Sequence, residues 1–201
     1  MTMTNFSRRL LLGSAGAILL PDLARATSIE ITPRCPDGDE PTPAQTAGPY
    51  FTPNSPERRS PIEVGMEGER ITLWGFVVDR NCKPVPNALL DLWHADASGT
   101  YDNSGYRLRG HQFSDAKGRY RFETIVPGLY PGRTRHFHIK VQAPHQEVLT
   151  TQLYFPGEAG NTSDRLYSPA LLLRPHYDFK PDLTRQLNDA VKTYNFMLDV
   201  G

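Results

Sequence analysis

The chain has 201 residues, and its 22 basic side chains balance its 22 acidic ones. A neutral chain lacks the basic surface that binds nucleic acid or an anionic membrane. We therefore expect small-molecule partners and no nucleic acid, in one domain large enough to bury a substantial core.

Residues 1–26 are predicted to be an export signal rather than part of the fold. Arg8 and Arg9 form a twin-arginine pattern, an apolar run follows from residue 10 to residue 20, and Ala24-Arg-Ala26 is a small-x-small cleavage site. The apolar run is far shorter than the roughly 20 residues of a membrane-spanning helix. We expect twin-arginine export to the periplasm or the exterior and no membrane span in the mature chain, with an ordinary secretory signal as the alternative.

The two cysteines, Cys35 and Cys82, fit an exported protein, because disulfides persist outside the cytoplasm. Neither lies in a CxxC or zinc-type spacing. The sequence leaves open whether they are bonded to each other, since the separation of their Cα atoms decides this.

An extended, proline-rich arm is predicted for residues 27–69. Residues 33–61 hold eight of the 18 prolines, with Asp, Glu, Asn and Ser between them. Proline interrupts helices and central strands, so neither is expected here. The aromatic pair Tyr50 and Phe51 indicates that the arm packs onto the domain instead of serving as a free linker.

Residues 70–201 show short strands with period-two patterning, separated by turn residues. A short helix is expected only at residues 183–190. We predict an all-β fold, a two-sheet antiparallel β-sandwich, with a barrel as the alternative. The clearest strands are expected at residues 71–78, 88–93, 119–124, 135–141, 150–155 and 194–200.

A candidate metal site centres on His136 and His138. Residues two apart on a strand share one face, so both imidazoles can reach one metal ion, while Phe137, Ile139 and Val141 face the core. Two tyrosines lie in loops rich in glycine and proline, Tyr101 and Tyr130. Each tyrosine alone is typical of packing, but two phenolates beside two imidazoles favour iron(III) over zinc.

Four motifs occur in a fixed order: Trp93-His-Ala-Asp96 with Gly99-x-Tyr101, Gly118-Arg-Tyr120 with Val126-Pro-Gly-x-Tyr130, Arg133-x-x-His136-x-His138, and Thr151-Gln152-Leu-Tyr-Phe155. Together they resemble the intradiol ring-cleavage dioxygenases, such as protocatechuate 3,4-dioxygenase, over about residues 42 to 200. The resemblance implies an oxidoreductase that uses non-haem Fe(III) and O2 to open a catechol-type ring between its two hydroxylated carbons, giving a muconate-type dicarboxylate. Which catechol is cleaved, and whether the chain forms a homo-oligomer, remain open.

The resemblance also implies roles for individual residues. Tyr101, Tyr130, His136 and His138 would bind the iron, with Tyr130 and His138 axial and a hydroxide or water as fifth ligand. Tyr130 would leave the metal to accept a substrate proton, and Arg133 would lie beside the substrate ring. Gln152 matches a pocket glutamine, and Pro49 with Tyr50 matches the arm at the pocket mouth. Only five residues separate Tyr130 from His136, so we expect the wall near Arg133 to be open or rebuilt.

Alternatives remain for the function and for several residues. The same strands suit a secreted transthyretin-like or carbohydrate-binding module without iron, and His136 with His138 alone would suit a zinc hydrolase. Arg133 would otherwise cap a loop carbonyl or pair with Asp96. Asp91 is expected either to orient a ligand histidine or to make a buried hydrogen bond to backbone. His94 is expected to be structural, and the remaining histidines are expected to be solvated: His111, His145 and His176.

Overall fold

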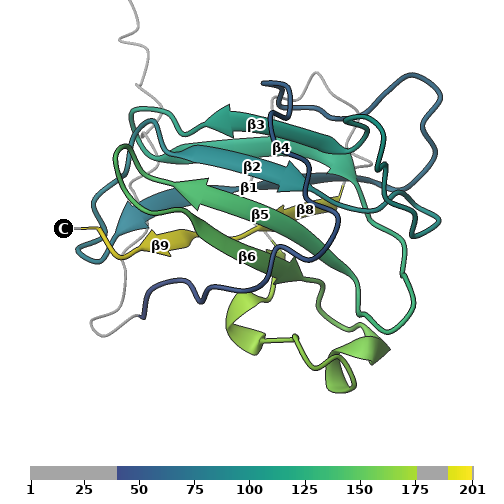
Figure 1. Ribbon diagram of the computed structural model, residues 1–201. Helices are drawn as coiled ribbons and strands as arrows, with labels where there is room; N and C mark the ends of the chain where they lie inside the picture. Colours follow the sequence, from purple (N-terminus) through teal and green to yellow (C-terminus); the bar gives the residue numbers. More distant parts are fainter. Residues whose placement is uncertain (1–39, 176–189, 201) are drawn as a thin grey trace, which may run out of the picture. The chain divides into compact units, whose positions relative to one another are not determined.

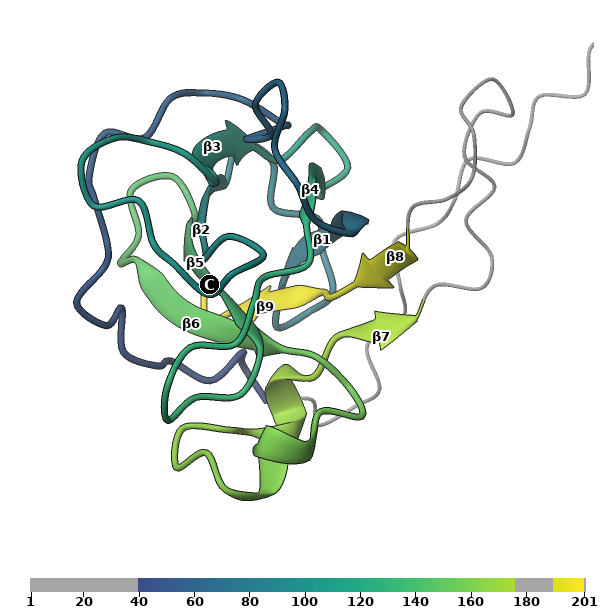
Figure 2. The ribbon, with the colours of Figure 1, turned by 90° about the vertical axis from the view of Figure 1, so that its right-hand side faces the viewer.

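The structure is a computed structural model that describes residues 40–175 and 190–200. Its strands form two facing sheets (Figures 1 and 2). The first sheet has the order β4-β1-β8-β7, with β9 also paired to β1, and the second has the order β3-β2-β5-β6. The strands are β1 (Arg70–Asp79), β2 (Leu89–Trp93), β3 (Arg109–Phe113), β4 (Arg119–Ile125), β5 (His136–Gln142), β6 (Leu149–Tyr154), β7 (Arg174–Pro175), β8 (Ala190–Thr193) and β9 (Phe196–Leu198).

The core lies between the inner faces of the two sheets. On β5, Phe137, Ile139 and Val141 are fully buried in it, as the alternation predicts. They meet residues of the opposite sheet and of their own sheet: Ile71, Leu73, Val77, Leu90, Leu92, Phe122, Leu153 and Phe196. The predicted all-β sandwich is therefore confirmed.

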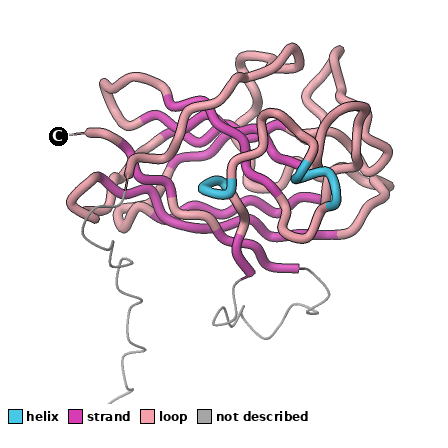
Figure 3. The backbone as a smooth tube through the Cα atoms, turned by 90° about the horizontal axis from the view of Figure 1, so that it is seen from below, coloured by secondary structure: helices cyan, strands magenta, loops and turns pink. Residues whose placement is uncertain are grey.

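Some elements differ from the sequence-based expectation. Strands β3, β7 and β8 were not among the clearest predicted strands, and two short 3-10 helices, η1 (Ala159–Thr162) and η2 (Pro169–Leu171), occur within the described residues (Figure 3). Both β8 and β9 run parallel to β1, whereas the other pairings are antiparallel. The helix expected at residues 183–190 falls almost wholly outside the described residues, and Ala190 begins β8.

Gly75 allows both β8 and β9 to pair with β1. The ten residues of β1 pair with β8 in their first half and with β9 in their second. Between the two, the chain crosses β1 so closely that a Cβ on Gly75 would lie 1.9 Å from the Tyr194 carbonyl oxygen. The Asn195 side chain then accepts the Phe76 N–H at 3.2 Å. Only glycine leaves room for this crossing.

The arm crosses the outer face of the second sheet, as the dark blue segment in Figure 1 shows. It starts at β6, where the Gln45 N–H donates to the Thr150 carbonyl at 2.7 Å. It continues over β2, where the Phe51 ring meets Trp93 edge-on at 4.8 Å. It ends at β3, where the Arg58 N–H donates to the His111 carbonyl at 2.8 Å. The arm therefore covers the sheet face opposite the core.

Outside the described residues lie the predicted export signal and Cys35. Cys82, in the turn after β1, is disulfide-bonded. Among residues 40–175 and 190–200, no helix has the length and apolar character needed to cross a membrane.

His94 is a structural histidine, as expected. It follows β2 and is 1% exposed. Its Nδ1 lies 2.8 Å from the Ala95 carbonyl oxygen, and its Nε2 lies 2.7 Å from the hydroxyl of Thr124 on β4. Burial lowers the pKa of His94 to about 4, against an ordinary value of 6.5. Nε2 thus ties the loop after β2 to the first sheet, while Nδ1 makes its contact within the loop itself.

Stability should fall below pH 6.5 because of this residue. The unfolded chain binds a proton at His94 below pH 6.5, whereas the folded chain resists it down to about pH 4. The stabilisation is therefore complete above pH 6.5 and is lost as the pH falls towards 4, by roughly 3 kcal/mol. The free energy of unfolding, measured with denaturant between pH 4 and 7, should change less with pH in His94→Asn than in the wild type. His145→Asn, at an exposed turn, should keep the wild-type dependence on pH. The same pH dependence in all three proteins would contradict this assignment.

Candidate active site

Four side chains from three parts of the chain meet on the outer face of the second sheet. His136 and His138 project from β5, while Tyr101 follows β2 and Tyr130 follows β4. The two histidine Nε2 atoms are 3.1 Å apart. The ring centres of Tyr101 and Tyr130 are 5.9 Å apart, that of Tyr130 is 5.8 Å from His136, and that of Tyr101 is 6.1 Å from His138. The structure thus brings together all four side chains that the sequence proposes as ligands.

The two Nε2 atoms contact each other, and the contacts of both imidazoles allow a metal ion to bind there. The Nδ1–H of His136 donates to the Thr134 carbonyl at 2.6 Å, so its Nε2 carries the lone pair. The Nδ1 of His138 is buried and has no hydrogen-bond partner within the described residues. If Nδ1 carries the proton, two lone pairs face each other across 3.1 Å, an arrangement that a cation between them would stabilise.

Burial keeps both imidazoles neutral. His136 and His138 are 4% and 2% exposed, and the His138 ring lies flat against Trp93 at 5.0 Å. Burial, with the nearby Arg133 charge, lowers the pKa of His136 to about 4, and burial with His136 holds the pKa of His138 well below 6.5. Neutral imidazole is the form that ligates metals.

Burial raises the pKa of Tyr101, whereas it lowers those of the two histidines, because in each case it disfavours the charged form. The neighbouring Tyr130 adds to the rise. A phenolate at this position therefore requires a bound cation.

Two glycines lock the tyrosine loops together. The Gly128 N–H donates to the Asp96 carbonyl at 2.7 Å. A Cβ on Gly128 would lie 2.4 Å from the Gly99 nitrogen, and one on Gly99, whose φ is +86°, would lie 2.1 Å from the Leu129 carbonyl oxygen. At these glycines the two loops touch backbone to backbone, which fixes the tyrosines relative to each other.

The arm forms an aromatic cover over the tyrosines. The Tyr50 ring stacks on Tyr101 at 4.4 Å with a 16° tilt and meets Tyr130 edge-on at 6.1 Å. Gly48 lies against the ring of His138, since a Cβ there would be 3.5 Å from its Cε1. Pro49, between them, is exposed. Tyr50 therefore lies directly at the candidate site.

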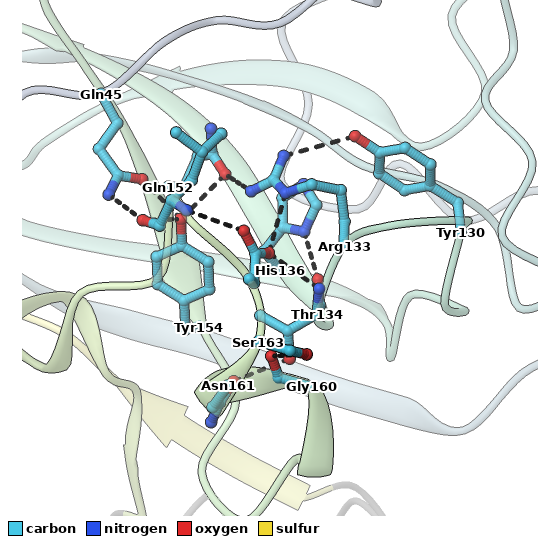
Figure 4. A network of polar contacts seen from close by, with 12 residues as sticks. Gln45, Tyr130, Arg133, Thr134, His136, Gln152, Tyr154, Gly160, Asn161 and Ser163 are labelled. Atoms are coloured by element: carbon cyan, nitrogen blue, oxygen red, sulfur yellow. Dashed lines mark hydrogen bonds and ion pairs between the residues drawn. The ribbon is translucent and has the colours of Figure 1, made fainter.

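Arg133 connects Tyr130 to the buried groups behind it (Figure 4). Its Nε donates to Asp164 at 2.9 Å, its Nη1 lies 3.4 Å from the Tyr130 hydroxyl, and its Nη2 donates to the Gln152 carbonyl oxygen. Although burial opposes the charge, the hydrogen bonds to Asp164 and Tyr130 raise the pKa of Arg133. The guanidinium is therefore a permanent cation. Gln152 is fully buried and reaches the site through Arg133.

Two alternative interpretations from the sequence are wrong. Asp96 pairs with Arg107 at 3.2 Å, and Arg133 pairs with Asp164 instead. Asp91 accepts the Ser55 hydroxyl at 2.7 Å and orients neither ligand histidine.

The remaining histidines are expected to be solvated, and one of them is not. His111 is half-buried and lies 2.7 Å from the Ser55 carbonyl oxygen, so it is not simply solvated. His145 is exposed as expected, and His176 lies outside the described residues.

Sequence reasoning missed Asp164 and Thr134, the residues that hold Arg133 and His136. Asp164 follows η1 in a stretch without strand periodicity and forms no motif with the histidines. The loop that carries it contacts the short 131–135 segment through Asp164 and Asn161. In the described part of the chain, no group of three His, Cys, Asp or Glu side chains could hold a metal ion. A metal at His136 and His138 would therefore take its further protein donors from the tyrosines.

A family model described as dioxygenase matches residues 46–200. This chain belongs to the intradiol ring-cleavage dioxygenases. It is 32% identical over 163 residues to the protocatechuate 3,4-dioxygenase beta chain of Burkholderia cepacia, covering 71% of this chain and 63% of that one. It is 30% identical to hydroxyquinol 1,2-dioxygenase of Nocardioides simplex, covering 70% and 56% respectively. The chain thus spans less than two thirds of the length of these two relatives.

A solved structure of this family matches over its whole length. It is the dioxygenase domain of a dioxygenase carbohydrate-binding protein fusion from the cellulolytic bacterium Streptomyces sp. SirexAA-E. The TM-score is 0.74 and the identity is 49%, covering 81% of this chain and 100% of that chain. Both the fold and the family of this chain therefore agree with the motifs in the sequence.

Gly128→Ala should disturb both tyrosines at once, because the new methyl group would collide with the Gly99 and Ala97 backbone. We expect a loss of about 1–3 kcal/mol in the free energy of unfolding and weaker binding of added iron. Gly132→Ala, in the same loop, meets no atom within 4 Å and tests backbone strain alone at φ +81°. Unfolding by denaturant and iron titration measure the two effects. Full iron binding by Gly128→Ala would refute the proposed lock between the loops.

Proposed function

We propose that the chain is an intradiol dioxygenase that binds one non-haem iron(III) and uses O2 to cleave a catechol-type ring between its two hydroxylated carbons. The product would be a muconate-type dicarboxylate. The proposal rests chiefly on the 3.1 Å separation of the two histidine Nε2 atoms beside two tyrosines. Two nitrogens that each lie about 2.1 Å from one ion, at a right angle, are about 3.0 Å apart.

The donor set favours iron(III) over zinc. Tyr101, Tyr130, His136 and His138 would supply two phenolates and two neutral imidazoles, and anionic oxygen donors suit a hard, oxidised ion. The two buried Nε2 atoms, 3.1 Å apart, fit such a cation, because it would lie between two lone pairs that otherwise face each other. A zinc hydrolase would need a carboxylate as ligand or base, and within the described residues none joins the two histidines.

A ferric ion held by these four side chains would bind both catechol oxygens and draw electron density from the ring, which makes a ring carbon reactive towards O2. The side chains of the protein would accept a proton, orient groups and exclude water. Tyr130 Oη would accept one of the two catechol protons, and Arg133 Nη1, 3.4 Å from that oxygen, would donate a hydrogen bond to it. Tyr50, stacked on Tyr101, and Trp93, stacked on His138, exclude water from one side of the site.

Arg133 would provide the main electrostatic contribution of the protein. Its Nη1 points to the Tyr130 side, where the substrate ring would lie, while Nη2 is held by Gln152 and Nε by the neutralising carboxylate of Asp164. A fixed cation beside negative charge that develops on the ring stabilises the transition state without reorganisation.

Colour and oxygen uptake test the proposal. The iron-loaded protein should be red to burgundy from phenolate-to-iron charge transfer and should consume O2 with at least one of catechol, protocatechuate, hydroxyquinol or a caffeoyl-type substrate. Tyr130→Phe should weaken the visible band and slow turnover. Tyr106→Phe, which removes only an exposed hydroxyl bonded to the Pro53 carbonyl, should leave both unchanged. A colourless iron-treated protein without oxygen uptake would favour the binding-module alternative.

We also propose that residues 1–26 direct export by the twin-arginine route, with cleavage after Ala26. The support is the sequence alone: paired arginines, a short apolar run and a small-x-small site. Replacing both Arg8 and Arg9 with lysine should retain the protein in the cytoplasm, as cell fractionation would detect. Undiminished export of this double variant would point to the ordinary secretory route.

A further inference from the structure

Asp164 is a buried carboxylate at the site that accepts several hydrogen bonds. Its Oδ2 accepts the Arg133 Nε–H and the Thr134 N–H, both at 2.9 Å. Its Oδ1 accepts the Leu166 N–H, also at 2.9 Å. The side chain of Asp164 is 2% exposed and that of Arg133 is 13% exposed. The pair is therefore shielded from solvent, where such an interaction holds its geometry.

The first consequence concerns the orientation of Arg133. A guanidinium is planar, so fixing Nε against a carboxylate and Nη2 against Gln152 leaves one orientation for the remaining nitrogen. In that orientation Nη1 faces the Tyr130 hydroxyl. Without the carboxylate, the buried cation would have no acidic partner among the contacts described for it, and burial would favour its movement towards water.

The second consequence concerns His136. Thr134 donates its N–H to Asp164, and its carbonyl accepts the His136 Nδ1–H. Its hydroxyl donates to Asn161 at 2.8 Å (Figure 4). The same carboxylate therefore holds Thr134, the residue whose carbonyl fixes the tautomer and direction of the imidazole.

We propose that Asp164 is a positioning residue that acts through Arg133 and, by way of Thr134, through His136. It touches neither substrate nor metal. The proposal rests on the proposed dioxygenase function, since Arg133 matters for catalysis only if a substrate ring lies beside it. Its physical basis is independent of that function, because every contact belongs to the protein itself.

Asp164→Asn removes the charge and keeps the size. We expect kcat to fall by about a hundredfold, as for a misplacement of about 1 Å, with KM changed less than about threefold because the loss falls on the transition state. The visible band of the iron-loaded protein should persist. Asp164→Glu, which keeps the charge, should recover part of kcat. Equal losses in the Asn and Glu variants would overturn the proposal.

Asp115→Asn is the matched control. Asp115 also combines an arginine partner, Arg119 at 2.7 Å, with bonds from backbone N–H groups, but it lies in the β3–β4 turn, away from the site. We expect unchanged kcat for this variant. A comparable loss there would assign the effect to general weakening of the fold.

A double-mutant cycle separates positioning from an independent role. Because the route through His136 remains when Arg133 is removed, adding Asp164→Asn to Arg133→Met should still lower kcat, but by much less than Asp164→Asn lowers it in the wild type. Losses that multiply in full would overturn the proposal.

The metal-free protein offers a readout that does not depend on activity. The Arg133 Nε–H should exchange slowly in nitrogen-15 NMR of the wild type and rapidly in Asp164→Asn. Equal protection in both proteins would overturn the proposal, whether or not any catechol is cleaved. Absence of oxygen uptake by the wild type, with the exchange difference present, would instead count against the proposed function alone.

Discussion

The register of β5 between β2 and β6 is the constraint on which the site depends. His138 lies opposite Trp93 on one side and opposite Gln152 on the other, while His136 lies opposite Tyr154. One row across the sheet thus supplies the stacking surface, the imidazole and the amide that holds Arg133. A slip of one residue would turn both histidines into the core and Phe137 out of it. The buried aliphatic face of β5 therefore enforces the geometry of its polar face.

Groups that are individually costly to bury are concentrated on that polar face. Two neutral imidazoles, a phenol and a guanidinium lie there, and the sheet alone would leave them open to water. The arm provides the cover, through Tyr50 over Tyr101 and Phe51 over Trp93. Its prolines reduce the conformational entropy lost when it is fixed on the sheet. A proline-rich segment is thus suited to closing a site that lies on an outer face.

The sequence could predict the parts that local pattern determines. Alternation around Phe137 and Ile139 indicates a strand with histidines on its other face, and the glycines flanking the tyrosines indicate tight loops. It could not predict β3, whose Arg109-Gly-His-Gln-Phe113 pattern puts its one large apolar side chain on the exposed side. The parallel pairing of β8 and β9 and the role of Asp164 depend on contacts between distant segments, which no local pattern encodes.

One continuous path of hydrogen bonds links the arm to the candidate metal site. Thr46 of the arm accepts from Gln152, Gln152 accepts from Arg133, and Arg133 donates to Asp164. Movement of the arm away from β6 would break the first of these bonds and leave the Gln152 side chain held by Arg133 and the Tyr154 hydroxyl alone. Closure of the arm and orientation of the guanidinium are therefore coupled, and the cover over the tyrosines also helps to set the charge beside them.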